Sequence, residues 1–419
     1  MEHLMIQTTP TTLLPTKQFK TVSIYIVFIG SFNRQSATSR LLLNRLLSSS
    51  TEKYATKKQV NDMLLGMYDA YFNITSFSMY ETLFTVFEME VVDPLFIESN
   101  VVADAIAFLK EVIFHPHLEN YAFPKKEFEE EKRMIRDQII NLYNNKTLYS
   151  TIRLLELIAK DEVMMISPSG NLEVLKAITS EQLYKDYLQL LQEEARIYVV
   201  GDVDSSIGDA FGDFHLQGKE GVHLYYGKPQ FRKPEAQFVT EEQEISQSRL
   251  LMGFDTNVFH QSPDVYTMIV LNTMLGGMAT SSLFTIIREQ NSLAYQVDSS
   301  VSFEFGLLVV SCGIDAAKQE AVSSMVMKIM TSYQEGSLDP VLLQMAKDNL
   351  TNSLKEAQDR PGDLFQIILR QELLHQPPVM EFIDRIQAVR IEDIKRLSGQ
   401  ITLHTTYFLK GVGPTYEKN

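Results

Sequence analysis

The same order of predicted strands and helices occurs twice in the chain, and this internal duplication constrains the fold more than any other feature. An alternating apolar strand at 21–30 is followed by an apolar helix, strands rich in β-forming residues, amphipathic helices and a closing strand at 195–204. The same order runs from a strand at 248–255 to a closing strand at 405–413. The period of about 210 to 225 residues indicates a duplicated domain rather than an array of short repeats.

Each half is predicted to be an α+β domain, in which helices pack on one mainly antiparallel sheet. We expect the N-terminal domain to span residues 1–217 and the C-terminal domain to span 238–419. The join at 218–237 concentrates glycine, proline and charged residues, which are typical of a linker. A chain of 419 residues fits this division, because a single core rarely grows to that size.

Composition excludes several classes of function. The formal net charge of −15 offers no basic footprint for phosphate, so we do not expect nucleic-acid binding. No apolar run approaches the roughly 20 residues of a transmembrane helix, and the first residues lack the pattern of a signal peptide. The single cysteine, Cys312, lies in an apolar run and is expected to be a small buried hydrophobic residue. One cysteine fits a reducing compartment, so we expect a cytoplasmic protein without membrane attachment.

The most specific motif lies in the second half, where residues 275–300 read LGGMATSSLFTIIREQNSLAYQVDSS. Its Gly276–Gly277 turn, its Arg288–Glu289 pair and its Leu293–Ala294–Tyr295 segment have the order and spacing of the C-terminal domain of the insulinase, or pitrilysin, family of metallopeptidases. Together with the duplicated order of elements, the resemblance covers essentially the whole chain. The chain is most similar to the non-catalytic members in Gram-positive bacteria, which are associated with aminopentanol modification of elongation factor P.

In that family, the first helix of the first domain carries a zinc motif of the form His-x-x-Glu-His. Two histidines four residues apart lie on one helical face and bind the metal, and the glutamate between them polarises a water molecule. In this chain the corresponding residues read LLLNR, so Leu41 and Arg45 occupy the histidine positions and Asn44 occupies the glutamate position. The third zinc ligand of the family, a glutamate on a later helix, corresponds to Gln138.

These substitutions imply a degenerate zinc site. Leucine cannot bind a metal, arginine stays protonated, and neutral amides are poor zinc ligands. We therefore expect no metal and no other cofactor in this chain.

The resemblance also assigns a role to Arg288 and Tyr295. In family members with two halves, the second half supplies this pair to the zinc site of the first half, where it binds the substrate backbone and stabilises the oxyanion. A structural alternative is that Arg288 caps the C-terminus of its helix and that Tyr295 packs in a strand. We favour the functional role, because the whole surrounding motif is present.

Histidines elsewhere offer one further candidate for a metal site. Of the eight histidines, only His115 and His117 lie together with a carboxylate, that of Glu119, in the sequence HPHLE. Because Pro116 falls just after an amphipathic helix, we interpret this segment as a helix end and turn.

The leading hypothesis is that this chain is the zinc-free subunit of a heterodimer. It would be inactive alone, pair with a zinc-bearing paralogue, donate Arg288 and Tyr295 in trans, and act on a peptide or an unfolded polypeptide. The alternative is a non-catalytic scaffold of the same fold that binds peptides or another protein. An autonomous peptidase is disfavoured, because the zinc ligands are missing. The sequence leaves open the substrate and whether the isolated chain forms a homodimer.

Overall fold

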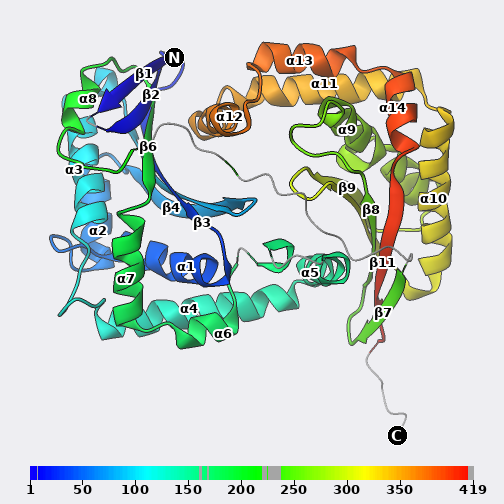
Figure 1. Cartoon of the computed structure of the whole chain (residues 1–419), viewed down its shortest axis with the longest axis horizontal. Coiled ribbons are helices and arrows are strands. Elements are labelled where there is room, and N and C mark those ends of the chain that lie inside the picture. Colours follow the sequence, from blue (N-terminus) through cyan, green and yellow to red (C-terminus); the bar gives the residue numbers. More distant parts are fainter. Residues whose placement is uncertain (7, 160–162, 168, 219–223, 225–236, 414–419) are drawn as a thin grey trace, which may run out of the picture. The chain divides into compact units, whose positions relative to one another are not determined.

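The computed structural model describes residues 1–413 except 7, 160–162, 168, 219–223 and 225–236 (Figure 1). The chain divides into two compact units, each with its own sheet and its own hydrophobic core. Unit 1 comprises Met1–Asn141, Ile166–Tyr225 and Gln358–Leu373, and unit 2 comprises Leu142–Met165, Tyr226–Ala357 and Leu374–Asn419. The predicted linker at 218–237 lies almost entirely outside the described residues.

The described part of unit 1 contains a six-stranded sheet in the order β1-β2-β6-β3-β5-β4. The strands are β1 (Glu2–Ile6), β2 (Thr9–Pro15), β3 (Thr21–Ser31), β4 (Tyr71–Met79), β5 (Thr82–Val92) and β6 (Glu194–Gly201). Only β2 and β6 pair in parallel, and the other neighbours are antiparallel. This sheet matches the predicted α+β class.

In the residues that the structure describes, seven α-helices of unit 1 come from the N-terminal half of the chain. They are α1 (Arg34–Ser49), α2 (Lys57–Gly66), α3 (Val101–Phe114), α4 (Lys125–Asn144), α6 (Leu172–Ala177), α7 (Ser180–Leu190) and α8 (Ile207–Ala210). Alternate residues of β3, such as Ile24 and Ile26, share a core with Leu42 and Leu46 of α1. The spacing of four residues puts both leucines on one helical face, which explains why α1 packs on this sheet.

Unit 2 repeats the arrangement. Its sheet has the order β7-β11-β8-β10-β9 in the described residues. The strands are β7 (Gln237–Gln243), β8 (Ser248–Asp255), β9 (Gln296–Ser302), β10 (Leu307–Ile314) and β11 (Thr402–Gly411). The strands β11 and β7 pair in parallel, as β2 and β6 do in unit 1. Apart from β1, the two sheets have the same strand order, so the predicted duplication is confirmed.

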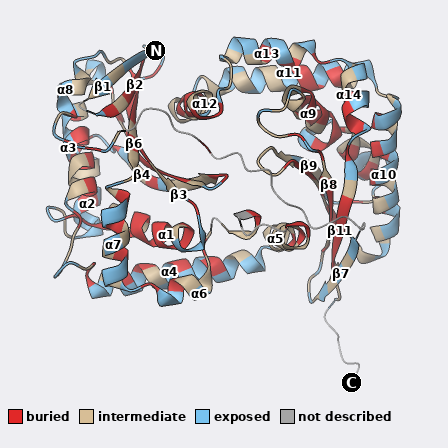
Figure 2. Ribbon diagram, viewed as in Figure 1, coloured by how far each residue is buried: buried red, intermediate tan, exposed pale blue. Residues whose placement is uncertain are grey.

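The helices of unit 2 follow the same sequence order as those of unit 1. Apart from short 3-10 turns, those that the structure describes in the C-terminal half are α9 (Val265–Asn272), which continues as η3 (Thr273–Gly277), then η4 (Phe284–Gln290), α10 (Gln319–Glu335), α11 (Pro340–Ala357), α13 (Val379–Ala388) and α14 (Ile391–Ser398). Figure 2 shows that buried residues concentrate in the strands and on the helix sides that meet them.

Each unit also contains one helix from the other half of the chain, an exchange that the predicted division at 218–237 does not include. Helix α5 (Lys146–Ile158) comes from the N-terminal half but lies in unit 2. Its Leu154 and Ile158 share a small core with Leu251 and Tyr407 of the second sheet.

Helix α12 (Pro361–Leu374) comes from the C-terminal half but packs on the first sheet. The ring of Phe365 stacks on Tyr25 of β3, with ring centroids 4.0 Å apart. The carboxylate of Glu372 accepts hydrogen bonds from the hydroxyls of Thr12 (2.9 Å) and Tyr198 (2.5 Å). The repeat in the sequence could not reveal this exchange, because it shows the order of the helices and not the sheet on which each one packs.

None of the helices in the described part of the chain combines the length and the apolar character that crossing a bilayer requires.

Candidate functional site

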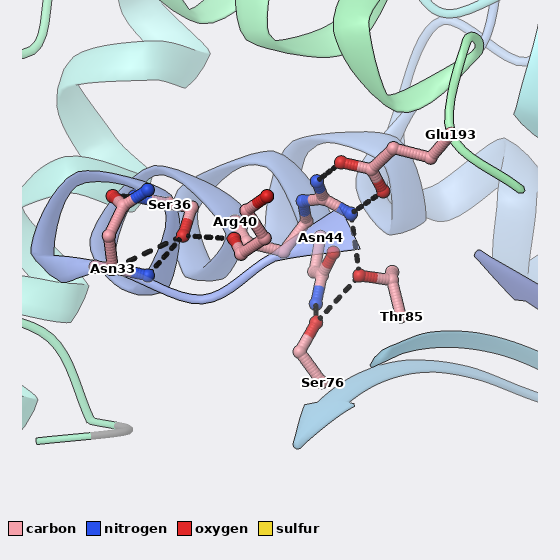
Figure 3. Close-up of polar contacts among 8 residues, drawn as sticks. Asn33, Ser36, Arg40, Asn44, Ser76, Thr85 and Glu193 are labelled. Atoms are coloured by element: carbon pink, nitrogen blue, oxygen red, sulfur yellow. Dashed lines mark hydrogen bonds and ion pairs between the residues drawn. The ribbon is translucent and has the colours of Figure 1, made fainter. Parts of the chain in front are cut away.

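Helix α1 carries the three residues that are predicted to occupy the positions of the zinc motif, and a capping box fixes where the helix begins. The Asn33 side chain accepts a hydrogen bond from the backbone N–H of Ser36 (2.9 Å), and the Ser36 hydroxyl accepts one from the backbone N–H of Asn33 (2.9 Å). These two bonds satisfy backbone donors that have no partner inside the helix (Figure 3). They set the helical register of Leu41, Asn44 and Arg45.

Leu41 is partly buried and packs against the core of unit 1. It lies beside Gly170, where an added Cβ atom would be 3.1 Å from the Leu41 Cδ1 atom. Gly170 has a φ angle of +90°, which side-chain-bearing residues rarely adopt. Leu41, which is predicted to occupy the first histidine position, thus packs in apolar surroundings beside Gly170.

Asn44 links α1 to the edge strand β4. Its side-chain amide donates to the Ser76 hydroxyl (2.8 Å), and that hydroxyl lies 3.2 Å from the hydroxyl of Thr85 on β5. Arg40, one turn earlier, donates to Thr85 (2.7 Å) and makes two bonds to the Glu193 carboxylate (2.5 and 3.0 Å) (Figure 3). The Oδ1 atom of Asn44 is buried and has no hydrogen-bond partner among the described residues. Asn44, which is predicted to occupy the glutamate position of the motif, is therefore part of a buried polar network.

Sequence reasoning missed the Arg40–Glu193 pair, although both side chains are almost fully buried. A bidentate bond between a guanidinium and a carboxylate is the geometry that best offsets the cost of burying both charges. One signal was present in the sequence, namely the glycine at position 30 in strand β3. A Cβ atom there would lie 2.3 Å from Glu193 Oε1, so Gly30 leaves the space that the carboxylate fills.

Arg45, predicted at the second histidine position, directly contacts Gln138, predicted at the third-ligand position. The Arg45 guanidinium donates to the side-chain oxygen of Gln138 on α4 (2.9 Å) and to Glu131 Oε2 (3.4 Å). Lys57 of α2 donates to the other oxygen of Glu131. The Glu131 side chain is only 4% exposed, so this buried carboxylate is held by two cations. Sequence reasoning placed Gln138 near α1 but did not single out Glu131.

This arrangement does not fit a zinc ion. A guanidinium cannot lose its proton to become a ligand, and its permanent charge repels a second cation. Leu41, predicted at the other histidine position, has no side-chain atom that can bind a metal. Nowhere in the described residues do three His, Cys, Asp or Glu side chains come together as a metal-binding group.

The histidines at 115 and 117 lie at a helix end. Helix α3 ends at Phe114, the backbone N–H of His115 closes its last turn, and Pro116 forms an isolated β-bridge with Thr51. The Nδ1 atom of His117 lies 3.5 Å from the Glu127 carboxylate. This geometry agrees with the interpretation of HPHLE as a helix end and turn.

Arg288 lies near the end of η4 in unit 2, and its side chain is 45% exposed. Its guanidinium lies 4.7 Å from the ring centre of Phe284 and 3.7 Å from the Glu289 carboxylate. The side-chain amide of Asn291 donates to the Ile286 carbonyl at this helix end (2.7 Å). Asn291 therefore makes the kind of contact that the structural alternative assigned to Arg288.

Tyr295 lies immediately before β9 and is 57% exposed, so its ring is not packed inside the sheet. Its hydroxyl donates to the Asp315 carboxylate (2.8 Å), and its backbone N–H donates to the Gly313 carbonyl (2.9 Å). The hydrogen bond and the negative charge of Asp315 raise the pKa of Tyr295 above its usual value. At neutral pH this phenol is protonated and faces solvent.

Gly276 and Gly277 are the last two residues of η3, and the chain turns after them, at 278–280. The structure thus differs from the predicted Gly-Gly turn by a short shift. An added Cβ atom on Gly276 would lie 2.5 Å from the backbone nitrogen of Ser299, so glycine is needed for the close approach of this helix to β9.

Comparison with known proteins gives similarity along almost the whole chain. A family profile described as "Peptidase M16 inactive domain" matches residues 177–350. "Probable inactive metalloprotease YmfF" of Bacillus subtilis (strain 168) is 26% identical over 404 residues, which cover 95% of both chains. "Uncharacterized zinc protease YmxG" of the same organism is 26% identical over 317 residues, covering 71% of this chain and 72% of that protein.

Solved structures extend the similarity to the fold. A conserved protein from Enterococcus faecalis V583 has a TM-score of 0.90 and 25% sequence identity, with 97% of each chain covered. A peptidase M16 inactive domain from Pseudomonas fluorescens has a TM-score of 0.79 and 16% identity, with 98% of each chain covered. Both similarities span the two sheets and their helices.

Proposed function

Because this chain belongs to the insulinase, or M16, family of metallopeptidases and is an inactive member of it, we propose that it is the zinc-free subunit of a heterodimeric peptidase. Its partner is a zinc-bearing paralogue, and its substrate is a peptide or an unfolded polypeptide. The chain has no hydrolytic activity alone. In the assembled enzyme, Arg288 and Tyr295 act in trans at the zinc site of the partner.

The proposal rests on a contrast between the degenerate zinc positions in unit 1 and the Arg288–Tyr295 pair in unit 2. At the degenerate zinc positions, Arg45, Gln138 and Glu131 satisfy one another, so no open coordination site remains. Arg288 and Tyr295, by comparison, are both about half exposed and both can donate hydrogen bonds. The chemistry that this chain can offer a peptide therefore resides in unit 2.

The proposed role follows from how charge develops during peptide hydrolysis. Zinc in the partner subunit supplies the activated water when it is bound there. As the carbonyl oxygen of the substrate gains negative charge, the guanidinium of Arg288 and the hydroxyl of Tyr295 donate hydrogen bonds to it. Donors that are already in place at that moment stabilise the transition state more than the ground state.

A second candidate function, a peptide-binding or protein-binding scaffold, is favoured by a groove in unit 2. The groove has a volume of about 580 Å³ and lies between α10 and the strands β7, β8 and β11. Phe238, Met252, Met327 and Leu403 contribute its apolar surface, and Phe238 is 53% exposed. A scaffold of this kind would bind a ligand without assisting hydrolysis.

Mixing the purified chain with a zinc-bearing paralogue from the same organism tests the proposal. We expect little hydrolysis of a peptide library by either protein alone and clear hydrolysis by the stoichiometric complex. If the partner alone is as active as the complex, the scaffold function is favoured instead. If the two chains do not associate, the heterodimer is excluded.

We also propose a cytoplasmic location and an association with aminopentanol modification of elongation factor P. The location is supported by Cys312, a single buried cysteine that fits a reducing compartment. The association is supported only by the resemblance to the non-catalytic Gram-positive members. Intact-mass analysis of elongation factor P from wild-type and gene-deletion strains tests it, because a change in the modified fraction is expected only if the two are connected.

A further inference from the structure

The Tyr295 hydroxyl is held by a residue that the family motif does not include. Asp315 directly follows β10, and its carboxylate accepts a hydrogen bond from the Tyr295 hydroxyl (2.8 Å). The Tyr295 backbone is fixed independently, because its N–H donates to the Gly313 carbonyl, two residues before Asp315. Backbone and side chain of Tyr295 are thus both attached to the end of β10.

Lys318 completes this support. Its ammonium lies 3.2 Å from the second oxygen of Asp315 and donates to the backbone carbonyl of Ser292 (2.9 Å). Ser292 has a φ angle of +52° and begins the short segment that leads to Tyr295. Asp315 and Lys318 therefore connect the Tyr295 hydroxyl to the backbone of Ser292, which belongs to the same segment as Tyr295.

This support limits what Tyr295 can do with its single proton. A phenol donates one hydrogen bond, and an ionised carboxylate is a stronger acceptor than a neutral peptide carbonyl. The Tyr295 hydroxyl therefore keeps its hydrogen bond to Asp315 while the peptide bond of the bound substrate is intact. An oxygen that gains negative charge during hydrolysis becomes a stronger acceptor, and rotation about the phenol C–O bond brings the proton to it without moving the ring.

We propose that Asp315, supported by Lys318, is the positioning residue for Tyr295. It fixes the phenol oxygen and prevents the hydroxyl from donating a hydrogen bond to the substrate carbonyl in the ground state. Tyr295 therefore contributes mainly in the transition state. The catalytic part of this inference rests on the proposed function, whereas the hold of Asp315 on Tyr295 is a property of the isolated chain.

The first test uses the isolated chain with ¹³Cζ-labelled tyrosine, and the Tyr295 resonance is assigned with the Tyr295→Phe variant. Removing the Asp315 charge with Asp315→Asn should shift the titration of Tyr295 to lower pH, towards the ordinary tyrosine value. Asp348→Asn removes an exposed carboxylate that contacts Gln344 rather than Tyr295, and it should leave the titration unchanged. If Asp315→Asn also leaves it unchanged, the proposed hold is overturned.

The second test uses the complex with the zinc-bearing paralogue and a fluorogenic peptide that the wild-type complex cleaves. In Asp315→Asn, Tyr295 can bond the ground-state carbonyl, so KM and kcat should both fall, each by about fivefold, as expected for one neutral hydrogen bond. In the Tyr295→Phe background, adding Asp315→Asn should change neither constant. A fall in kcat without a fall in KM, or an equal effect in both backgrounds, would overturn the positioning role. If no complex cleaves any peptide, the proposed function fails, and the titration alone decides whether Asp315 holds Tyr295.

Discussion

The Arg45 guanidinium donates a 2.9 Å hydrogen bond to the side-chain oxygen of Gln138, which lies 93 positions later in the chain. By resemblance, these are the positions of the second histidine and of the third ligand of a zinc site. Arg45 also lies 3.4 Å from the buried Glu131 carboxylate. The guanidinium of Arg45 therefore satisfies the side-chain oxygens of Gln138 and Glu131, so these groups do not require a metal ion.

Loss of Arg45 should destabilise unit 1. In Arg45→Ala, the buried Glu131 keeps Lys57 as its one ionic partner among the described residues, and we expect a loss of about 1–2 kcal/mol in the free energy of unfolding. Arg45→Lys should lose less, since it keeps the charge but not the planar fork. Urea unfolding measures the effect, with exposed Arg133→Ala on the same helix as Gln138 for comparison. If Arg45→Ala and Arg133→Ala have equal effects, the account of this site is wrong.

The purified chain should hold no stoichiometric zinc and should cleave no peptide alone. The combined variant Leu41→His, Asn44→Glu, Arg45→His and Gln138→Glu should gain about one zinc per chain, because the contact between Arg45 and Gln138 shows that these positions face one another. Metal analysis after dialysis measures both. One tightly bound zinc in the wild-type chain, or hydrolysis that a chelator abolishes, would contradict this prediction.

The exchanged helix α12 should be essential to unit 1. Phe365 is buried and stacks on Tyr25, so Phe365→Ala should cost about 3–5 kcal/mol. Phe238→Ala removes the same side chain from a site that is 53% exposed and should cost far less. Thermal unfolding of both variants measures the difference, and similar costs would argue against tight packing of α12.

The placement of α5 and α12 also predicts how the chain behaves after proteolytic cleavage. Limited proteolysis should cleave first within 218–237, which is rich in polar and turn-forming residues. The two fragments should remain associated under native conditions, because α12 of the C-terminal fragment packs on the first sheet and α5 of the N-terminal fragment packs on the second. Size-exclusion chromatography distinguishes this result from two separately folded fragments, which would contradict the exchange.

Cys312 should be unreactive in the folded chain. Burial raises the pKa of its thiol to about 12, so only about one thiol in 10⁴ would be ionised at pH 8. Since the thiolate is the reactive form, a thiol reagent at pH 8 should label the chain in urea but hardly at all without it. Labelling of the native protein at the rate of a free cysteine would show that this residue is accessible.

The fold class and the duplication followed from the sequence because hydrophobic periodicity and element order are local properties that each half repeats. The exchange of α5 and α12 did not follow, because an amphipathic helix fits either sheet and only tertiary packing selects one. Glu131 illustrates the same limit. It belongs to a charged run, yet it lies on the helical face that also buries Phe128 and Ile135, and its partners Arg45 and Lys57 are far away in sequence.

Arg288→Lys should impair the assembled enzyme strongly, although it keeps the positive charge. A lysine ammonium is a point charge and cannot reproduce the planar donor fork of a guanidinium. Folding and partner binding should stay close to wild type, because the Arg288 side chain is 45% exposed. Measurement of kcat and of complex formation on the same sample separates the two effects, and a normal kcat would remove Arg288 from the reaction.

The kcat of a complex assembled with Tyr295→Phe tests the central claim most directly, because this variant removes one hydroxyl and keeps the ring. Tyr121→Phe, at a tyrosine that is 78% exposed in unit 1, is the matched control. We predict that both variants bind the zinc-bearing partner as the wild type does. We further predict that Tyr295→Phe alone lowers kcat, by about 10²–10³ as for the loss of one oxyanion donor. An unchanged kcat in a fully assembled Tyr295→Phe complex would contradict catalysis in trans by this residue.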